Sequence, residues 1–259
     1  MRSFGNLVVN EWLKLSKKRS FFIPYAVLIG YVGLFGYLAK VYESTGGMGS
    51  EGKFVSTLDF IQNAMSHSGM GQFITFLAII ASAGIVTKEY SLGTIKLLLI
   101  RSQSRNKILA SKYVTAVLYT LSLFLCTGIV AMITGGIAFG FSGSEIGWND
   151  VFTGGLYSLI YTLVYVTITF MVGVLTKSTG ATIGVGMFIV LLEGLVTMLL
   201  SKYAVVKYII FTNADLSVYS NGGAPFKGMT MNFSLIVIAV YMVLFLGASF
   251  VTFKKRDVA

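Results

Sequence analysis

Several residue types that build catalytic and metal sites are scarce among the 259 residues of this sequence. Cys126 is the single cysteine, so no disulfide can form within the chain. His67 is the single histidine, and one histidine supplies neither a histidine-based metal site nor the usual catalytic triads. We therefore predict no metal site, and we interpret Cys126 as a small packing residue and His67 as a solvated loop residue.

A phosphate-binding motif is missing as well. The pattern G-x-x-x-x-G-K-[ST], whose backbone cradles nucleotide phosphates, does not occur in the sequence. We therefore expect no ATP hydrolysis and no cofactor in this chain, which is not a complete enzyme on its own. An intramembrane enzyme would need paired catalytic groups in its apolar segments, where Glu193 is the one clearly placed acid.

Charged residues are few, and they are grouped in a particular way. They make up 12% of the chain, about half the fraction usual in a soluble domain, and the formal net charge is +10. A basic surface can bind nucleic acid, but here Lys and Arg flank apolar runs, as topology signals and contacts to lipid headgroups do. We therefore expect contacts with membrane lipid and none with nucleic acid.

Long apolar runs dominate the sequence. Hydrophobic residues make up 55% of the chain, and the mean hydropathy is +0.80. A helix needs about 20 mainly apolar residues to cross the hydrocarbon, and continuous runs predict helices because barrel strands alternate in polarity. Six spans are predicted, at about 21–38, 70–87, 113–141, 151–175, 179–200 and 232–253. The predicted fold class is an all-α membrane protein, with residues 1–259 forming a single transmembrane domain.

Lys and Arg are distributed unevenly over the loops that join these spans. Fifteen of the 20 basic residues lie on the terminal segments and on the second and fourth loops: Arg2, Lys14, Lys17, Lys18, Arg19, Lys88, Lys96, Arg101, Arg105, Lys107, Lys112, Lys177, Lys254, Lys255 and Arg256. The other five are Lys40, Lys53, Lys202, Lys207 and Lys227. Because cytoplasmic loops carry the excess of Lys and Arg, both termini are predicted to be cytoplasmic.

The segment before the first span has the pattern of an amphipathic helix. Its apolar residues recur at helical spacing: Phe4, Leu7, Val8, Trp12 and Leu15. We predict a helix in the cytoplasmic interface, with Trp12 at headgroup depth and Lys17, Lys18 and Arg19 beside the headgroups. The alternative is a cytoplasmic helix packed on protein. Pro24 is expected in the first turn of the first span, where its missing N–H leaves no additional carbonyl unpaired.

Two outer loops are long enough to fold. In the first, residues 54–65 could form a short amphipathic helix on the outer surface. The last, at 201–231, is rich in aromatic residues, which is typical of an interfacial belt or of a re-entrant segment; both interpretations remain open. Two G-x-x-x-G patterns, Gly136/Gly140 and Gly180/Gly184, would allow helices to approach closely, although 29 glycines make chance matches common.

The second cytoplasmic loop, residues 88–112, carries the most informative pattern. Gly93 would end the helix of the second span, and Thr94 could cap a new helix with an apolar stripe among basic residues. Ser104 could cap a further turn that leads into the third span. The pattern predicts a short helix presented to the cytoplasm, placed to relay motion to a partner.

This loop resembles that of type 2 ABC exporter permeases, the membrane subunits of bacterial drug, bacteriocin and peptide exporters. The resemblance rests on Glu89, Gly93, Thr94, Lys96, Leu98, Ser104, Arg105, Ile108, Leu109 and Lys112. The opening segment 10–19 and the closing segment 253–257 are similar to the usual ends of that family. Ser102 departs from the pattern, because many relatives carry proline there, and this puts the local turn in doubt.

The resemblance implies a permease that dimerises in the bacterial cell membrane and pairs with two ATP-binding subunits, which would hold ATP and Mg²⁺. A homodimer is expected, and a heterodimer of two permeases remains open. The expected coupling residues on the second loop are Glu89, Gly93, Thr94, Lys96, Arg101 and Arg105, with Glu89 and Arg105 as polar contacts. The competing interpretation is that the charges of this loop only anchor membrane helices, which explains Lys88 and Lys112 well.

We therefore expect a permease subunit of an ATP-driven exporter that moves an amphiphilic compound, such as an antimicrobial or toxic peptide, a drug or a lipid-like molecule, and confers resistance to it. The alternative is a sensory or scaffold membrane protein that anchors an ATPase without transport. Glu193 lies near the middle of the fifth span, where an acid costs about 2.5–3.5 kcal/mol on insertion scales. It is expected to line a path or to make a static hydrogen bond, and both roles remain open.

Overall fold

The computed structural model describes residues 4–45, 54–91 and 104–255, and within these ranges all regular structure is helical. Six helices are long and apolar enough to cross a membrane. They are α2 (Arg19–Ser44), α4 (Gln72–Ser91), α6 (Arg105–Ala138), α7 (Trp148–Thr176), α8 (Thr179–Leu200) and α10 (Met231–Lys255). Each contains most of one predicted span, so the prediction of six helical spans is confirmed.

The helix ends show which local signals were interpreted correctly. Ser104 is the N-cap of α6, and its hydroxyl accepts a hydrogen bond from the backbone N–H of Lys107 at 3.4 Å, as predicted. The expectation for Pro24 was wrong, because α2 begins at Arg19 and Pro24 lies beyond the first turn. Its missing N–H therefore removes one intrahelical hydrogen bond to the carbonyl of Ser20.

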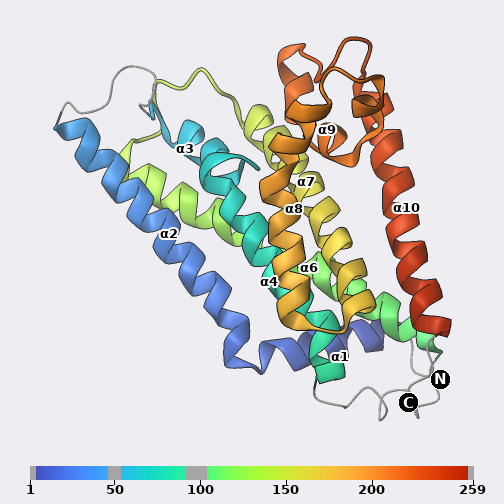
Figure 1. Ribbon diagram of the computed structural model, residues 1–259. Helices are drawn as coiled ribbons and strands as arrows, with labels where there is room; N and C mark the ends of the chain where they lie inside the picture. Colours follow the sequence, from blue (N-terminus) through green and yellow to red (C-terminus); the bar gives the residue numbers. More distant parts are fainter. Residues whose placement is uncertain (1–3, 46–53, 92–103, 256–259) are drawn as a thin grey trace.

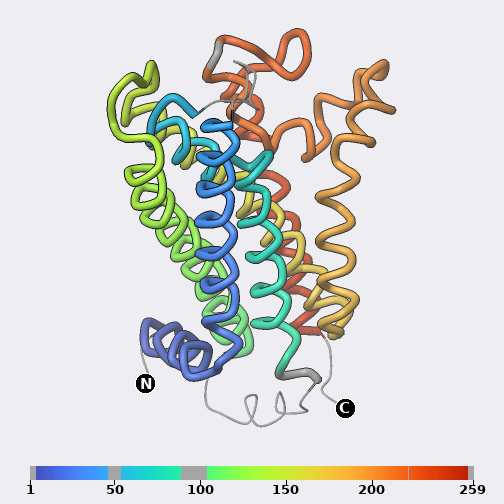
Figure 2. The backbone as a smooth tube through the Cα atoms, turned by 90° about the vertical axis from the view of Figure 1, so that its left-hand side faces the viewer, coloured from blue at the N-terminus to red at the C-terminus, as the bar shows by residue number. Residues whose placement is uncertain are grey.

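The six long helices form one bundle whose two ends differ. Helix α1 (Phe4–Ser16) lies across one end, together with the C-terminal end of α10, at the bottom of Figures 1 and 2. The short elements lie at the opposite end: α3 (Thr57–Met65), η2 (Gly69–Gly71), η3 (Ala204–Tyr208), α9 (Ile210–Ala214) and η4 (Ser217–Asn221). We call these the α1 end and the α9 end. The first and last helices thus approach the same end of the bundle, as an even number of spans requires.

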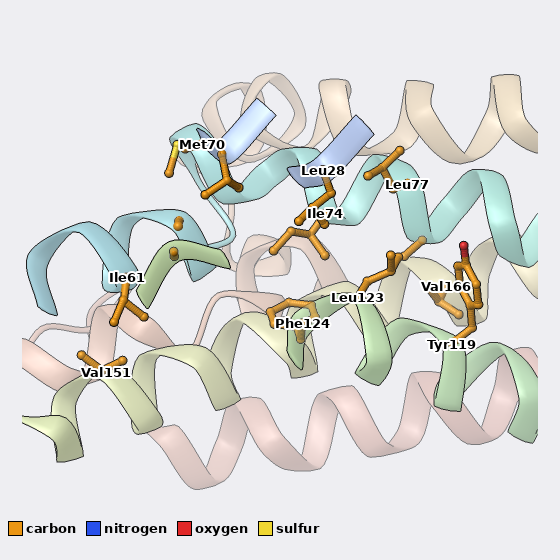
Figure 3. Close-up of a cluster of buried hydrophobic side chains, with 14 of the residues drawn as sticks. Leu28, Ile61, Met70, Ile74, Leu77, Tyr119, Leu123, Phe124, Val151 and Val166 are labelled. Atoms are coloured by element: carbon orange, nitrogen blue, oxygen red, sulfur yellow. The ribbon is translucent and has the colours of Figure 1, made fainter. Parts of the chain in front are cut away.

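Helices α4 and α7 form the centre of the bundle. In both, 61% of the most apolar 18-residue window is buried, against 11% in α8 and α10. One large cluster of buried side chains joins α2, α3, α4, α6 and α7, and Figure 3 shows Leu28, Ile74, Leu123 and Phe124 meeting within it. The outward faces of α8 and α10 are left apolar and exposed, as expected for helices whose solvent is lipid.

The helix predicted within residues 54–65 exists as α3, and its apolar face is buried in the bundle. Helix α3 begins with a capping box, in which Ser56 and Asp59 satisfy each other's backbone N–H groups. Its side chains Phe60 and Ile61 are 0% and 3% exposed and belong to the main buried cluster. The helix is therefore part of the core, and only its polar face is open.

The segment 201–231 folds into short helices that cover the α9 end (Figure 1). Ile210, Ala214 and Leu216 are buried in a second cluster with side chains of α7, α8 and α10. The amide of Asn213 donates to the carbonyls of Lys207 and Ile209, both at 2.8 Å, and its oxygen accepts from the Ser234 hydroxyl at 2.8 Å. These bonds fix the segment to the start of α10.

Close helix approach occurs at glycines outside the predicted patterns. A Cβ at Gly180 or Gly184 would meet no atom within 4 Å of it among the described residues. A Cβ at Gly186 would lie 2.7 Å from Oγ1 of Thr169 on α7 and 2.9 Å from Cγ2 of Ile79 on α4. Among the glycines of α8, Gly186 is therefore the one at which the helix approaches α4 and α7 closely.

Replacing Gly186 with alanine is expected to destabilise the protein by about 1–3 kcal/mol, because the added methyl group overpacks the contact with α4 and α7. Gly184→Ala is the matched control on the same helix, where space is open and alanine favours the helix. Thermal unfolding in detergent measures both. Equal melting temperatures for the two variants would contradict the packing described for α8.

Candidate functional site

A polar cluster lies inside the apolar bundle near the α9 end, centred on Glu193 of α8. The hydroxyl of Tyr161 donates to one carboxyl oxygen of Glu193 at 2.6 Å, and the hydroxyl of Tyr165 donates to the other. Both tyrosines are on α7 and are 1% exposed. Because they are four residues apart, they lie on one face of α7 and hold both oxygens of the acid.

His67 and Asp215 extend this cluster. Nε2 of His67 lies 3.2 Å from Oδ2 of Asp215, and the rings of His67 and Tyr161 lie 4.6 Å apart between centroids. The His67 side chain is only 13% exposed, so the prediction of a solvated loop residue was wrong. Burial would raise the pKa of Asp215, but the hydrogen bond and charge of His67, with hydrogen bonds from Ser217, hold that pKa below its ordinary value.

Two pockets adjoin the cluster, and His67 lines both. One, of about 480 Å³, is lined by Glu193, Asp215, Thr212 and apolar side chains of the 201–231 segment. The other, of about 870 Å³, lies between α3 and the start of α7 and includes Asp59, Glu145 and Asp150. Neither set of lining residues, within the described part of the chain, contains Lys or Arg. The two pockets at the α9 end therefore have polar linings that include acidic residues.

At the α1 end, Glu11 of α1 and Lys112 of α6 form a buried ion pair. Nζ of Lys112 lies 2.9 Å from one carboxyl oxygen of Glu11, while Nζ of Lys14 lies 2.6 Å from the other. The side chains of Lys112 and Glu11 are 3% and 12% exposed. Lys112 therefore lies inside the protein, and its ion pair joins α6 to α1. Burial would raise the pKa of Glu11, but Lys112 and Lys14 together hold it below its ordinary value.

The coupling residues predicted from the loop are only partly described. Gly93, Thr94, Lys96 and Arg101 lie outside the described residues. Glu89 falls in the last turn of α4. Arg105 begins α6, and its guanidinium donates to the backbone carbonyl of Lys254 on α10 at 3.4 Å. The start of α6 is thereby held against the end of α10.

The residues predicted to lie at the membrane interface have different surroundings. Trp12 packs on Phe21 and Tyr119, with ring centroids 5.7 and 6.5 Å apart. Lys17, Lys18 and Arg19 are exposed where α1 turns into α2. Helix α1 therefore has protein contacts on one side, and its position relative to lipid stays a prediction.

Most partners in these clusters were not predicted. Tyr161 and Tyr165 had one available signal, a pair of hydroxyl-bearing residues at helical spacing in the span that precedes the span of Glu193. No sequence signal pointed to Asp215 beyond its place in an aromatic loop. Glu11 was part of the opening segment, but its partner lies 101 residues away.

Comparison with known proteins places this architecture in a family. A family model described as "Protein of unknown function (DUF2705)" matches residues 23–259, which include nearly all of the six long helices. The chain belongs to this family. Residues 1–22, which include α1 and the first turn of α2, precede the match.

Two relatives of this DUF2705 protein come from Bacillus subtilis (strain 168). "Uncharacterized protein YhcI" is 36% identical over 199 residues, which cover 70% of this chain and 63% of the relative. "Uncharacterized membrane protein YdbK" is 29% identical over 202 residues, covering 70% of this chain and 76% of the relative. The chain thus spans less than two thirds of the length of YhcI. The name of YdbK agrees with the six apolar helices, and this chain is a multi-pass membrane protein.

Proposed function

We propose that this chain is the permease subunit of an ATP-driven ABC exporter, acting as a homodimer with two separate ATP-binding subunits. One observation carries the proposal: the three segments that resemble exporter permeases meet at the α1 end. Glu11 of the opening segment pairs with Lys112 at the end of the second loop, and Arg105 of that loop contacts Lys254 of the closing segment. Contacts between all three segments are expected if they act as one unit.

The charge distribution supports an orientation for this unit. Among the described residues, Lys14, Lys17, Lys18, Arg19, Lys88, Arg105, Lys107, Lys112, Lys177, Lys254 and Lys255 lie on the segments that reach the α1 end (Figure 1). The pockets with Asp59, Glu145 and Asp150 lie at the α9 end. By the positive-inside rule, the α1 end faces the cytoplasm and the α9 end faces outward.

Labelling of single cysteines tests this orientation. In a Cys126→Ser background, Asn106→Cys at the start of α6 and Asn149→Cys at the start of α7 both place the thiol at an exposed position. We expect a membrane-impermeant maleimide to label position 149 in intact cells and position 106 only after the cells are broken. Labelling of position 106 from outside would reverse the proposed topology.

In the proposed mechanism, closure of the ATP-binding subunits pushes on the loop between α4 and α6. The central helix α4 packs on α7, and α6 carries Lys112 and Arg105, so motion of the loop would be passed into the core and to α1 and α10. Alternating access would follow if the partner subunits bind one arrangement more tightly than the other. No covalent chemistry is assigned to this chain.

Purification of the chain from its native cells tests the proposal. We expect an ATP-binding subunit to copurify in a two-plus-two complex, and we expect expression of this complex to raise the tolerated concentration of at least one compound in a panel of antimicrobial peptides and drugs. Arg105→Glu should preserve ATP hydrolysis by the complex and abolish the tolerance, with Lys107→Glu, an exposed neighbour on α6, as control. ATP hydrolysis by the chain alone would refute the permease assignment. A stable complex that moves nothing in liposomes would favour the scaffold function.

A further inference from the structure

We propose that the 870 Å³ pocket between α3 and the start of α7 binds a short peptide that carries a basic residue. Its volume lies within the range of sites for drug-sized ligands, about 300–1,000 Å³. The pocket has a mouth at Glu145 and Asp150, which are exposed, and a floor at Ser158, which is buried. The inference goes beyond the permease assignment, because binding to the purified chain requires neither ATP nor a partner subunit.

The polar faces of two helices build this pocket. The lining residues of α3 and α7 recur at spacings of three and four: Asp59, Gln62 and Asn63 on α3, and Asp150, Thr153, Gly154 and Ser158 on α7. Side chains at these spacings share one face of a helix. From Asp150 to Ser158 the helix rises about 12 Å. The pocket is therefore an elongated polar site whose mouth and floor are two helical turns apart.

Ser158 supplies an independent sign of a ligand. The residue is 2% exposed, its side chain lines the pocket, and its hydroxyl has no hydrogen-bond partner among the described residues. The buried hydroxyls of Ser82 and Thr212 also lack a partner there, but protein atoms seal off their oxygens. The Ser158 oxygen borders the pocket instead. Because buried hydroxyls without a partner are uncommon, this one is available to a ligand that reaches the floor.

The carboxamide of Gln62 lies beside the same floor. Its Nε2 is 3.7 Å from the position that a Cβ on Gly154 would occupy, and Gly154 is one helical turn from Ser158. Within the described part of the chain this carboxamide makes no hydrogen bond. A hydroxyl and a carboxamide each offer both a donor and an acceptor, and so does a peptide group. A polyamine has donors only, and it would leave the donors of Ser158 and Gln62 unpaired.

The mouth determines the sign of the ligand's charge. Glu145 has no ion pair or hydrogen bond among the described residues, and Asp150 uses one oxygen to accept from the N–H of Gly147 at 2.9 Å. Asp59 accepts hydrogen bonds through both of its oxygens, so it contributes charge only. The described lining contains no Lys or Arg. A cleft lined by charges of one sign concentrates ligands of the opposite sign, so the mouth selects a basic group.

The separation of the two ends favours a peptide over a smaller cation. An extended chain advances about 3.3–3.6 Å per residue, so about 12 Å corresponds to three or four residues. A basic side chain at the mouth would thus place peptide groups of the same ligand at Ser158 and Gln62. Phe54, Val55 and Ile146 supply apolar wall along the pocket. A metal ion or a single amino acid would engage one end only.

Peptides that differ at one position test the proposal on the full chain in phosphatidylcholine nanodiscs, with binding to empty discs subtracted. They are acetylated and amidated heptapeptides of glycine with lysine, norleucine or glutamate at the centre, and equilibrium dialysis compares them with spermidine. We expect the lysine peptide to bind about tenfold more tightly than the norleucine peptide, because charge-assisted hydrogen bonds are the stronger ones. The glutamate peptide should bind more weakly than either. Spermidine should bind more weakly than the lysine peptide, because it lacks amide groups.

Variants then assign the binding to the two ends of the pocket. Glu145→Gln should weaken the lysine peptide about threefold and leave the norleucine peptide unchanged, whereas Ser158→Ala should weaken both peptides about threefold. Glu43→Gln is the matched control for charge, because it removes an acid at the same end of the bundle outside the pocket. Ser82→Ala is the matched control for the hydroxyl, because protein seals off that oxygen. Neither control should change binding.

The two pocket substitutions remove no hydrogen bond found among the described residues, so both variants should keep the melting temperature of wild type. Equal binding of the lysine and norleucine peptides would overturn the proposal. Spermidine binding as tight as that of the lysine peptide, or losses in the controls equal to those in the pocket variants, would do the same. None of these results would affect the permease assignment, which rests on the α1 end.

Discussion

Replacing Lys112 with methionine is expected to lower the free energy of unfolding by about 3 kcal/mol, with a matching loss of melting temperature in detergent. The substitution leaves the carboxylate of Glu11, whose side chain is 12% exposed, without its partner on α6. Breaking a buried ion pair costs about 3–5 kcal/mol, and the lower value applies here because Lys14 still contacts Glu11 at 2.6 Å.

Two controls separate the pair from a general effect of charge. Lys107→Met removes the same charge from an exposed position of α6, and its expected effect is within about 0.5 kcal/mol. The double variant Glu11→Leu/Lys112→Met should recover most of the loss, because apolar side chains often replace a buried ion pair without cost. The single variant Glu11→Leu is measured as well. If the double variant loses as much free energy of unfolding as the two single variants together, the pair does not stabilise the junction of α1 and α6.

The same pair predicts how stability depends on pH. The pKa of Glu11 is lower in the folded protein than its ordinary value of 4.5, so the folded state favours the ionised carboxyl. The contribution is therefore present in full above about pH 4.5 and is lost as the pH falls through the folded pKa. The difference in melting temperature between wild type and Lys112→Met should accordingly shrink on acidification.

The spans could be predicted because their signal lies within each segment. Length and continuous hydropathy define α8 completely, and the serine at position 104 marks the start of α6 without reference to any other helix. The placement of α3 could not be predicted in this way. Its capping box and its polar face are compatible with a surface helix, and only the positions of α6 and α7 make its apolar face part of the core.

Contacts between side chains of distant segments could not be predicted from the sequence for a related reason. The partners of Glu193 and of Lys112 depend on which faces of two helices meet, and one sequence does not specify that. His67 was misplaced because its neighbours are serines and glycine, the composition of a solvated loop. Its burial results from contacts with Tyr161 and Asp215, which arrive from two other parts of the chain.

Replacing Glu193 with leucine is expected to lower the free energy of unfolding by about 2 kcal/mol or more, because it leaves the hydroxyls of Tyr161 and Tyr165 without their acceptor. Each buried donor left unpaired costs about 1–3 kcal/mol, and the two hydroxyls can recover part of that by bonding to each other. Glu193→Gln keeps the size of the side chain and one carbonyl acceptor, so its melting temperature should stay close to that of wild type.

The glutamine variant therefore separates a structural role of Glu193 from a role in export. If the carboxyl faces a different environment in the inward-open and outward-open states, removal of its charge shifts the balance between them, because only a differential interaction moves a conformational equilibrium. We expect the complex with Glu193→Gln to fold and to hydrolyse ATP but to export less, whereas Tyr165→Phe should reduce stability more than export. Export at the wild-type level by a well-folded glutamine variant would restrict Glu193 to holding α8 against α7 through its two tyrosines.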